Sequence, residues 1–484
     1  MTSELTYVST ESVVQEQQLY VNGRWVKAET SMEVTSPWDD SVIGRIAAAT
    51  ADQVSTAIGS AKAAQNRGLA PHQRAVVLRT TAALLHERSE QFAQSISREA
   101  GKPIQLARIE VARGAEVFDY AADEARSLPA EAVPVDGSAA GAGHVAFTIA
   151  QPLGVIAAIT PFNFPLNTVA HKVAPAIAAG CPVVLKPSEK TPFTAGLLAE
   201  LMTEAGLPGG FLNVVTGEPS TVVDVLANDD RVVAITFTGS SRVGWQLKQS
   251  SPKKHHTMEL GSSTAMYIAA DADIPAAVAA AAKSAFGFAG QVCLSLQRLY
   301  VERPIFDAVV DGLARAADAM IAGDPSEEAT EIGPLITAAA TDRLLGWIEN
   351  AQHTGAAVRA GGVTVGPVLR PTVVTGVAAE DQLVCSEVFG PIVSVLPVDG
   401  VEQALEHINA VPYGLNASVF TSNVATAMRF SRAVESGQAI VNDAPNFRTE
   451  NMPYGGVKDS GQGREGIPYA VREFTHHKLV VLAG

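Results

Sequence analysis

Cysteine is scarce in this sequence, and its distribution narrows the possible kinds of site. The 484 residues include three cysteines, at positions 181, 293 and 385. An odd number at such wide spacing excludes a disulfide scaffold and is typical of a reducing compartment. The sequence also lacks Cys-x-x-Cys, His-x-x-x-His and HExxH patterns, and clusters of Asp, Glu and His at ligand spacing. We therefore predict no metal site.

Long apolar runs and an excess of basic charge are missing as well. No apolar stretch reaches the roughly 20 residues that a membrane helix needs. The sequence has 35 basic and 50 acidic side chains and a formal charge of −15, which disfavours binding to nucleic acid or to anionic lipid. The first residues are polar and acidic, without the apolar core of a signal peptide. We expect a cytoplasmic protein with no nucleic-acid or membrane partner.

The remaining composition is that of a globular protein, with 47% hydrophobic and 18% charged residues. At about 150 residues per domain, the length predicts two or three domains. Near the N-terminus, Asn22-Gly23 separates two strand-like pieces. This dipeptide tolerates positive φ at both turn positions, so it predicts a β-hairpin. Thr50 and Gln53 form a capping-box pattern, which predicts the start of a helix.

A long helical pattern and then a series of short strands follow. The helical pattern runs from about residue 71 to residue 99, with Gly101 as the expected stop. After it, Thr191-Pro192 predicts the start of another helix. Short apolar runs, mostly β-branched, alternate with helical patterns at residues 154–160, 182–186, 211–215 and 232–237. Such strands are buried on both faces of a parallel sheet, so we expect a doubly wound α/β fold that binds nucleotides at its carboxyl edge.

A second α/β pattern begins near residue 265. Its strand-like runs cover residues 266–270, 299–302, 391–397, 416–421 and 439–443. Two extended pieces, 143–150 and 476–482, fit neither sheet. Unpaired strands of this kind pair with each other or with another chain.

Cys293 differs from the other two cysteines in its surroundings. Free cysteine is usually a small buried hydrophobe, and this reading suits Cys181 and Cys385. Cys293 instead follows Gly287, Ala289, Gly290 and Gln291, in a segment that cannot form a good helix or strand interior. A loop of small residues gives a substrate access to the sulfur, as a nucleophilic thiolate requires.

Two further polar residues lie where chemistry is expected. Asn163, in TPFNFPLN, follows the first parallel strand and is either a helix cap or an oxyanion donor. Glu259, in HHTMELGSS, is either an exposed edge residue or a tuned general base. Position alone does not decide between these readings.

Two strand ends are candidates for binding a dinucleotide. FTGSSRVG, residues 237–244, forms a strand-to-helix turn that suits a phosphate, although such turns are common. In KPSEKTP, Lys186 and Glu189 follow the second strand, where they are either solvated or contact ribose hydroxyls.

Taken together, the ordered motifs PFNFP, KPSE, FTGSxxxG, MELG, GQxC, EVFGP and MPYGGVKDSGQGREG closely resemble the aldehyde dehydrogenase superfamily. The resemblance implies a Rossmann-type cofactor domain, an α/β catalytic domain and a small β element for oligomerisation. Its implied boundaries are a lead at 1–17, a cofactor domain at 18–126 and 149–258, a catalytic domain at 259–445 and a bridging element at 127–148 and 466–484.

The resemblance also implies a reaction, in which an aldehyde is oxidised to a carboxylic acid with reduction of NAD(P)⁺. Cys293 matches the nucleophile, Asn163 the side-chain half of the oxyanion hole, and Glu259 the base that activates water for thioester hydrolysis. The residues matching cofactor contacts are Thr160, Phe162, Lys186, Ser188, Glu189, Gly239, Ser240, Leu260, Glu387 and Phe389. Glu189 favours NAD, with NADP possible, because an acid at the ribose repels a 2′-phosphate.

The substrate is implied less closely. Candidate pocket residues are Phe164, Leu294, Arg108, Arg298, Phe447 and Arg448. Each arginine is either a contact to an anionic substrate or a structural ion-pair residue. The runs MELGSS, GQVCLSLQR and NDAPNFR are similar to the lactaldehyde and phosphonoformaldehyde dehydrogenase-like branch. Ser262 and Ser263 stand where the family usually has Gly and Lys, and Phe162 where it usually has Trp.

Three alternatives to a hydrolytic aldehyde dehydrogenase stay open. They are a CoA-acylating member, a catalytically silent member acting as a binding or structural protein, and a cysteine hydrolase. Glu259 disfavours the first, the intact set of Cys293, Asn163 and Glu259 the second, and the lack of an oriented histidine the third. A homodimer or homotetramer is expected by resemblance.

Overall fold

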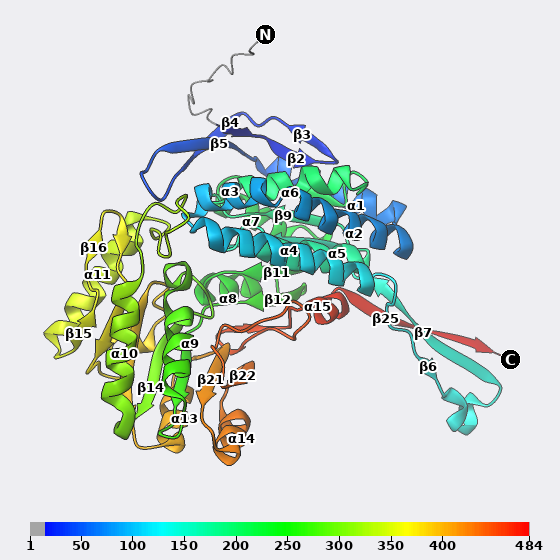
Figure 1. Cartoon of the computed structure of the whole chain (residues 1–484). Helices are drawn as coiled ribbons and strands as arrows, with labels where there is room; N and C mark the ends of the chain where they lie inside the picture. Colours follow the sequence, from blue (N-terminus) through cyan, green and yellow to red (C-terminus); the bar gives the residue numbers. More distant parts are fainter. Residues whose placement is uncertain (1–14, 484) are drawn as a thin grey trace, which may run out of the picture.

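The computed structural model describes residues 15–483, in which two α/β layers lie side by side and a β arm projects from one of them (Figure 1). The first layer is an eight-stranded sheet in the order β24-β12-β11-β8-β9-β10-β2-β3, in which β24 is the short edge strand Gly461–Gln462. Its parallel strands are β8 (Val155–Ile159), β9 (Val183–Lys186), β10 (Leu212–Val214), β11 (Val232–Thr238) and β12 (His255–Glu259). The expected parallel sheet is thus confirmed.

The parallel strands of this sheet are buried on both faces. Alternate residues of β8 enter different cores: Ile156 packs with α4 and α5, whereas Ala157 packs with α1 and α7. The period of two in a strand requires this alternation. The helices around the sheet are α1 (Ala51–Arg67), α2 (Pro71–Glu87), α3 (Ser89–Ala100), α4 (Ile104–Glu124), α5 (Asn167–Ala179), α6 (Phe193–Glu204), α7 (Pro219–Asn228) and α8 (Ser241–Ser250).

Local patterns near the N-terminus form as expected. The hairpin of β2 (Leu19–Val21) and β3 (Arg24–Val26) turns at Asn22 and Gly23, whose φ values are 54° and 75°. Thr50 caps α1 with a complete capping box. Residues 15–17 form β1 (Gln15–Gln17), paired with β5 (Val42–Ala48), so the predicted lead was wrong for these three residues. The rest of the lead, residues 1–14, lies outside the described residues.

Two helix predictions need correction. The pattern from 71 to 99 is not one helix, since Arg88 interrupts it between α2 and α3. The helix predicted from Thr191-Pro192 begins at Phe193 instead. The buried carboxylate of Glu99 accepts hydrogen bonds from the N–H groups of Phe193 and Thr194 at 2.8 and 3.1 Å. A distant side chain therefore caps α6.

The second layer is a seven-stranded sheet in the order β15-β18-β19-β14-β13-β21-β22. Its strands are β13 (Thr264–Ile268), β14 (Leu296–Glu302), β15 (Ala357–Ala360), β18 (Thr372–Thr375), β19 (Ile392–Val398), β21 (Asn416–Phe420) and β22 (Gln438–Val441). It is covered by α9 (Ile274–Phe286), α10 (Phe306–Ala319), α11 (Ala338–His353), α13 (Val401–Asn409) and α14 (Val424–Ala433).

The two extended pieces that fitted neither sheet pair with each other. β25 (Thr475–Ala483) runs antiparallel to β7 (His144–Pro152), and β6 (Ala132–Val133) completes this three-stranded arm. Figure 1 shows the arm extending away from both layers. Within residues 15–483, no helix is both long and apolar enough to cross a membrane.

Candidate active site

The register of the parallel strands brings the predicted cofactor residues to one edge of the first sheet. Ile159 lies opposite Lys186 and Phe237, and Thr238 lies opposite Glu259. The segments beginning at Thr160, Pro187, Gly239 and Leu260 therefore leave the sheet together. This carboxyl edge is where open α/β sheets bind ligands.

The loop that carries Cys293 is held in an unusual conformation. Phe288 and Ala289 adopt left-handed backbone angles with φ of 51°, and Gly290 follows with φ of 67°. A Cβ at Gly290 would lie 2.0 Å from the carbonyl oxygen of Gly390, so only glycine fits. Gln291 fixes the loop further, because its Oε1 accepts a hydrogen bond of 2.9 Å from the N–H of Ile336. Cys293 itself is half-buried.

Asn163 lies against this loop. Its Nδ2 donates a hydrogen bond of 2.8 Å to the backbone carbonyl of Gln291, two residues before Cys293. A carboxamide nitrogen carries two hydrogens, so a second N–H remains. Asn163 is buried, and its Oδ1 has no hydrogen-bond partner among residues 15–483. Of its two sequence readings, a helix cap is not observed, since the N-terminus of α5 is capped by Glu110.

Glu259 ends β12, a parallel strand that sequence analysis missed, and its carboxyl group is buried. Neither carboxylate oxygen has a hydrogen-bond partner in the described part of the chain. Burial raises the pKa of Glu259 well above the usual carboxyl range, and the like charge of Glu465 raises it further, against the opposing effect of Arg448 and Lys172. A buried, unpaired carboxyl with a raised pKa is typical of a general acid or base.

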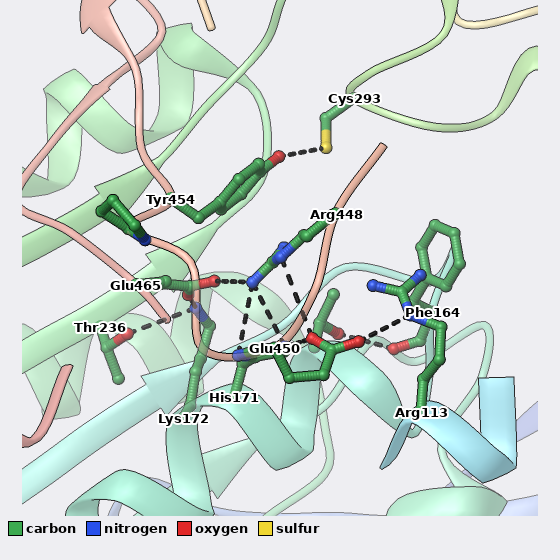
Figure 2. A network of polar contacts seen from close by, with 12 residues as sticks. Arg113, Phe164, His171, Lys172, Thr236, Cys293, Arg448, Glu450, Tyr454 and Glu465 are labelled. Carbon is green, nitrogen blue, oxygen red and sulfur yellow. Dashed lines mark hydrogen bonds and ion pairs between the residues drawn. The ribbon is translucent and has the colours of Figure 1, made fainter. Parts of the chain in front are cut away.

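A polar cluster from several distant segments adjoins Cys293 (Figure 2). The hydroxyl of Tyr454 lies 3.0 Å from Cys293 Sγ. The guanidinium of Arg448 stands over the Tyr454 ring, 3.8 Å from its centroid. Burial raises the pKa of the Cys293 thiol to about 11, to which Glu259 contributes, whereas Tyr454 and Arg448 oppose the rise.

The two carboxylates near Arg448 are each paired with another cationic side chain. Glu450 accepts hydrogen bonds from Arg113 Nε at 2.6 Å and from His171 Nε2 at 2.5 Å. Burial opposes ionisation of Glu450, but His171, Arg448 and Arg113 outweigh it and lower its pKa. Lys172 pairs with Glu465 at 2.6 Å. Arg448 Nη2 lies 3.2 Å from His171 Nε2. Its contacts to carboxylates are long, at 4.0 Å to Glu450 and 3.9 Å to Glu465, and its Nε lacks a hydrogen-bond partner within residues 15–483.

The first sheet contributes one part of the predicted dinucleotide site, at the ends of its strands. Lys186 Nζ donates to Glu189 Oε2 at 3.0 Å. Burial would raise the pKa of Glu189, but Lys186 outweighs it and the pKa is lowered. Thr160 Oγ1 is buried without a hydrogen-bond partner in the described residues, and Ser188, two residues after Lys186, is also buried. Gly239 and the exposed Ser240 precede α8, with Ser240 at its N-cap position.

The second layer contributes the other part of the predicted dinucleotide site, through Glu387 and Phe389. Glu387 is half-buried, and its Oε1 accepts a 2.9 Å hydrogen bond from the N–H of Ser262. A Cβ at Gly261 would lie 2.6 Å from Glu387 Oε2, so glycine permits this approach. Burial raises the pKa of Glu387 to about 7, against the opposing Ser262 hydrogen bond. Phe389 meets Phe162 edge to face, with 5.9 Å between ring centroids. Leu260 packs over Gly244 nearby.

The predicted pocket residues divide into two groups. Leu294 is buried with Tyr454 and Leu415, next to Cys293. Phe164 lies beside Phe288, with 6.2 Å between ring centroids, and the exposed Phe447 directly precedes Arg448. Arg448 belongs to the polar cluster described above.

Two predicted arginines lie elsewhere. Arg108 forms exposed ion pairs with Glu90 and Glu328 on the outer surface of α4. Arg298 is fully buried, and its guanidinium donates to the backbone carbonyls of Ser263 and His407. Arg108 thus forms ion pairs, which is one of its two sequence readings. Arg298 instead donates to backbone carbonyls and forms no ion pair within residues 15–483, so the ion-pair reading does not describe it.

Five members of the site were not predicted from the sequence: Arg113, His171, Lys172, Tyr454 and Glu465. Tyr454 and Glu465 fall within the quoted run 452–466, which was the only available signal. No group of three or more His, Cys, Asp or Glu side chains in residues 15–483 is placed to hold a metal ion.

Comparison with known proteins agrees with this geometry. Residues 25–480 match the Aldehyde dehydrogenase family. A 3-sulfolactaldehyde dehydrogenase of Priestia aryabhattai is 41% identical over 465 residues, covering 96% of this chain and 97% of the relative. A lactaldehyde dehydrogenase of Methanococcus vannielii is 35% identical, covering 96% of this chain and 99% of the relative.

Solved structures extend the likeness to cofactor complexes. Aldehyde dehydrogenase 21 from Physcomitrella patens, in complex with the reaction product succinate, superimposes with a TM-score of 0.94 at 34% identity, covering 97% and 98% of the two chains. PnpE in complex with nicotinamide adenine dinucleotide gives 0.93 at 36%, covering 97% and 98%. Glyceraldehyde-3-phosphate dehydrogenase GapN from Methanocaldococcus jannaschii, complexed with NADP, gives 0.91 at 33%, covering 94% and 100%.

The chain therefore belongs to the aldehyde dehydrogenase family. It is an NAD(P)-dependent oxidoreductase that oxidises an aldehyde to a carboxylic acid, as the sequence motifs predicted. Its relatives are consistent with the lactaldehyde-like branch.

Proposed function

We propose that Cys293 is the nucleophile of this reaction, with Asn163 as oxyanion donor and Glu259 as general base. The observation that carries this assignment is a set of three groups: a half-buried thiol, an amide held at its loop, and a buried carboxyl that acts electrostatically on the thiol and has no hydrogen-bond partner in residues 15–483. Cys181 lies fully buried in the core and is not a candidate.

The proposed reaction proceeds through a covalent adduct and a thioester on Cys293. The Cys293 thiolate forms a C–S bond to the aldehyde carbon, and the carbonyl electron pair moves to oxygen. The second N–H of Asn163 and the Cys293 backbone N–H stabilise that oxyanion, and one such donor is typically worth about 10²–10³ in rate. Loss of hydride from the same carbon leaves a thioester. Glu259 then takes a proton from water, the water attacks the thioester, and the C–S bond breaks with its electron pair on sulfur.

The residues at the carboxyl edge fit a dinucleotide. Lys186 and Glu189 suit the adenosine ribose, Gly239 and Ser240 the pyrophosphate, and Glu387 the second ribose. The orphaned Thr160 hydroxyl and the close packing at Gly261 are the features of a cradle for a bound group. When bound, the nicotinamide supplies the hydride acceptor. Glu189 disfavours a 2′-phosphate, so we infer a preference for NAD over NADP.

We further propose that the substrate is a short aldehyde with an anionic group, such as a sulfonate. Glu450 is neutralised by Arg113, and Glu465 by Lys172. Burial lowers the pKa of His171, so this ring adds no positive charge, and the positive charge of Arg448 is left in excess. The Arg448 side chain is 12% exposed, so a ligand can reach it. It adjoins the Tyr454 ring that touches the nucleophile. The names of the sulfolactaldehyde and lactaldehyde relatives support a three-carbon substrate.

The test compares 3-sulfolactaldehyde with lactaldehyde, which lacks the sulfonate, by NADH formation. Arg448→Met should raise KM for the sulfonate about 10- to 100-fold, the usual range for a charge-assisted hydrogen bond, with little change for lactaldehyde. Arg108→Met, on the outer surface, is the matched control and should change neither. Equal effects of Arg448→Met on both aldehydes would contradict an anionic substrate.

Assembly and location are also part of the proposal. The arm exposes large apolar side chains, among them Val145 at 64%, Leu479 at 51% and Leu482 at 54%. Exposed apolar strands of this kind favour association, so we infer a homodimer or homotetramer. The three free cysteines suit a reducing compartment, so we infer that the protein is cytoplasmic. The arm would serve as the bridging element beside the cofactor and catalytic domains predicted from the sequence. Light scattering of wild type and of a Leu479→Lys variant tests this, since the variant should dissociate.

A further inference from the structure

Tyr454 is rigidly placed against the reacting sulfur. Its backbone N–H and carbonyl both bond to Glu465, and its ring packs with Leu294 and Leu415. The side chain is buried, at 2% exposure. Within residues 15–483, Cys293 Sγ is the one hydrogen-bond partner of its hydroxyl, at 3.0 Å.

The ionisation of the two groups fixes the direction of this hydrogen bond. A thiolate has no proton and can only accept, so the phenol must donate once Cys293 ionises. Burial raises the pKa of Tyr454 well above its usual value, with Cys293 and Glu259 adding to the rise and Arg448 opposing it. The phenol therefore keeps its proton over the range in which the thiol loses its own.

The surrounding charges leave few other groups to favour the thiolate. Glu259, at the end of β12, and Glu387, after α12 (Gln382–Cys385), both oppose ionisation of Cys293. Arg448 favours it from the far side of the Tyr454 ring. Tyr454 is the group in direct contact with the sulfur, and a hydrogen bond to an ionised group is stronger than a neutral one.

We propose that Tyr454 is a further catalytic residue, whose hydroxyl donates a hydrogen bond to the Cys293 thiolate. The inference rests on the proposed role of Cys293 as nucleophile. The bond acts twice: it increases the thiolate fraction before attack, and it stabilises the thiolate again when the C–S bond of the thioester breaks. Tyr454 keeps its proton throughout, so the step needs no other reactant.

The test is the pH dependence of Cys293 alkylation by iodoacetamide, read on the Cys293 peptide by mass spectrometry. Tyr454→Phe keeps the ring, its packing and the stacked Arg448, and removes only the hydroxyl. We expect the alkylation midpoint to rise by about one pH unit or more, the shift for one hydrogen bond to a charge. Because a more basic thiolate is also more nucleophilic, the rate at neutral pH should fall by about 3- to 10-fold.

Two controls separate this effect from loss of structure. Tyr120→Phe, at an exposed position on α4, should leave the profile unchanged, and alkylation of Cys385 should be equal in every variant. A fluorotyrosine at position 454 has the same shape and a more acidic hydroxyl, so it should lower the midpoint. This second substitution decides the matter if Tyr454→Phe folds poorly.

The results that overturn the proposal are specific. An unchanged or lowered midpoint in Tyr454→Phe, or an unshifted midpoint with fluorotyrosine, would show that the hydroxyl does not donate to the thiolate. Steady turnover by Cys293→Ala would instead refute the proposed nucleophile. The alkylation assay needs no aldehyde, so the two failures are distinguishable.

Discussion

The Nζ atom of Lys102 donates a hydrogen bond of 2.7 Å to the backbone carbonyl of Asn163. The same ammonium group pairs with Glu110 and stands over the rings of Phe164 and Phe288, 3.8 and 4.4 Å from their centroids. One buried cation thus contacts both the loop of the oxyanion donor and the loop of the nucleophile.

Lys102→Met should destabilise the protein and lower kcat, because Glu110 would become an unpaired buried charge. Removing one partner of a buried ion pair typically costs about 3–5 kcal/mol. Thermal unfolding followed by calorimetry measures the loss. Arg303→Met breaks an exposed pair with Asp399 and should cost less than about 1 kcal/mol. Equal losses in the two variants would show that the Lys102 pair has no special importance.

The raised pKa of Glu259 predicts that the rate of deacylation falls at low pH, where this carboxyl is protonated. A general base acts in its ionised form, so the rate should rise with pH until Glu259 is deprotonated, well above the usual carboxyl range. Glu465→Gln removes a like charge and frees Lys172, and both changes lower the pKa of Glu259. The acid limb of the pH profile of kcat should therefore move to lower pH. An acid limb at the same pH would show that a group other than Glu259 titrates there.

Glu387, whose pKa burial raises to about 7, predicts a second pH effect, on cofactor affinity. A carboxylate accepts hydrogen bonds from ribose hydroxyls, and protonation below that pKa removes an acceptor. The dissociation constant for NAD should therefore increase as pH falls through about 7. Glu387→Gln should weaken binding and flatten this dependence, as measured by titration calorimetry. A steep dependence surviving in the variant would assign the effect to another group.

The pair of Glu189 and Lys186 predicts the effect of charge on cofactor choice. Glu189→Gln removes the negative charge and leaves Lys186 free to meet a 2′-phosphate. The ratio of kcat/KM for NADP over NAD should increase by about tenfold or more, since a charge-assisted hydrogen bond replaces a repulsion. Glu204→Gln, at an exposed ion pair with Arg88, should leave the ratio unchanged. An unaltered ratio in Glu189→Gln would place the ribose elsewhere.

Features of the fold that depend on local sequence were predictable. The Asn22-Gly23 turn and the capping box at Thr50 involve residues within three positions of each other, and both formed as expected. Most parallel strands were predictable because burial on both faces requires continuous apolar runs. The strands β12 (HHTME) and β18 (TVVT) lack such a run and were not predicted. The cap of α6 was not, because Glu99 lies 94 residues before the amide that it bonds.

Contacts within the functional site were harder to predict, because they join residues that are still further apart in the sequence. Tyr454 and Cys293 are 161 positions apart, so nothing in either segment indicates their contact. Arg108 and Arg113 lie five residues apart on α4. Five residues turn a helix by about 140° from the starting face, which directs Arg108 to Glu90 and Arg113 to Glu450. Arg108 was predicted as a site residue and Arg113 was not, because packing decides which face of a helix meets the site.

Rapid-quench analysis of Glu259→Gln with a reactive aldehyde and NAD tests the nucleophile and base together. One equivalent of NADH per active site should form in a burst and then stop, and mass spectrometry should find the acyl group on the Cys293 peptide. Continued turnover at the wild-type rate, or an acyl group on another residue, would contradict the account.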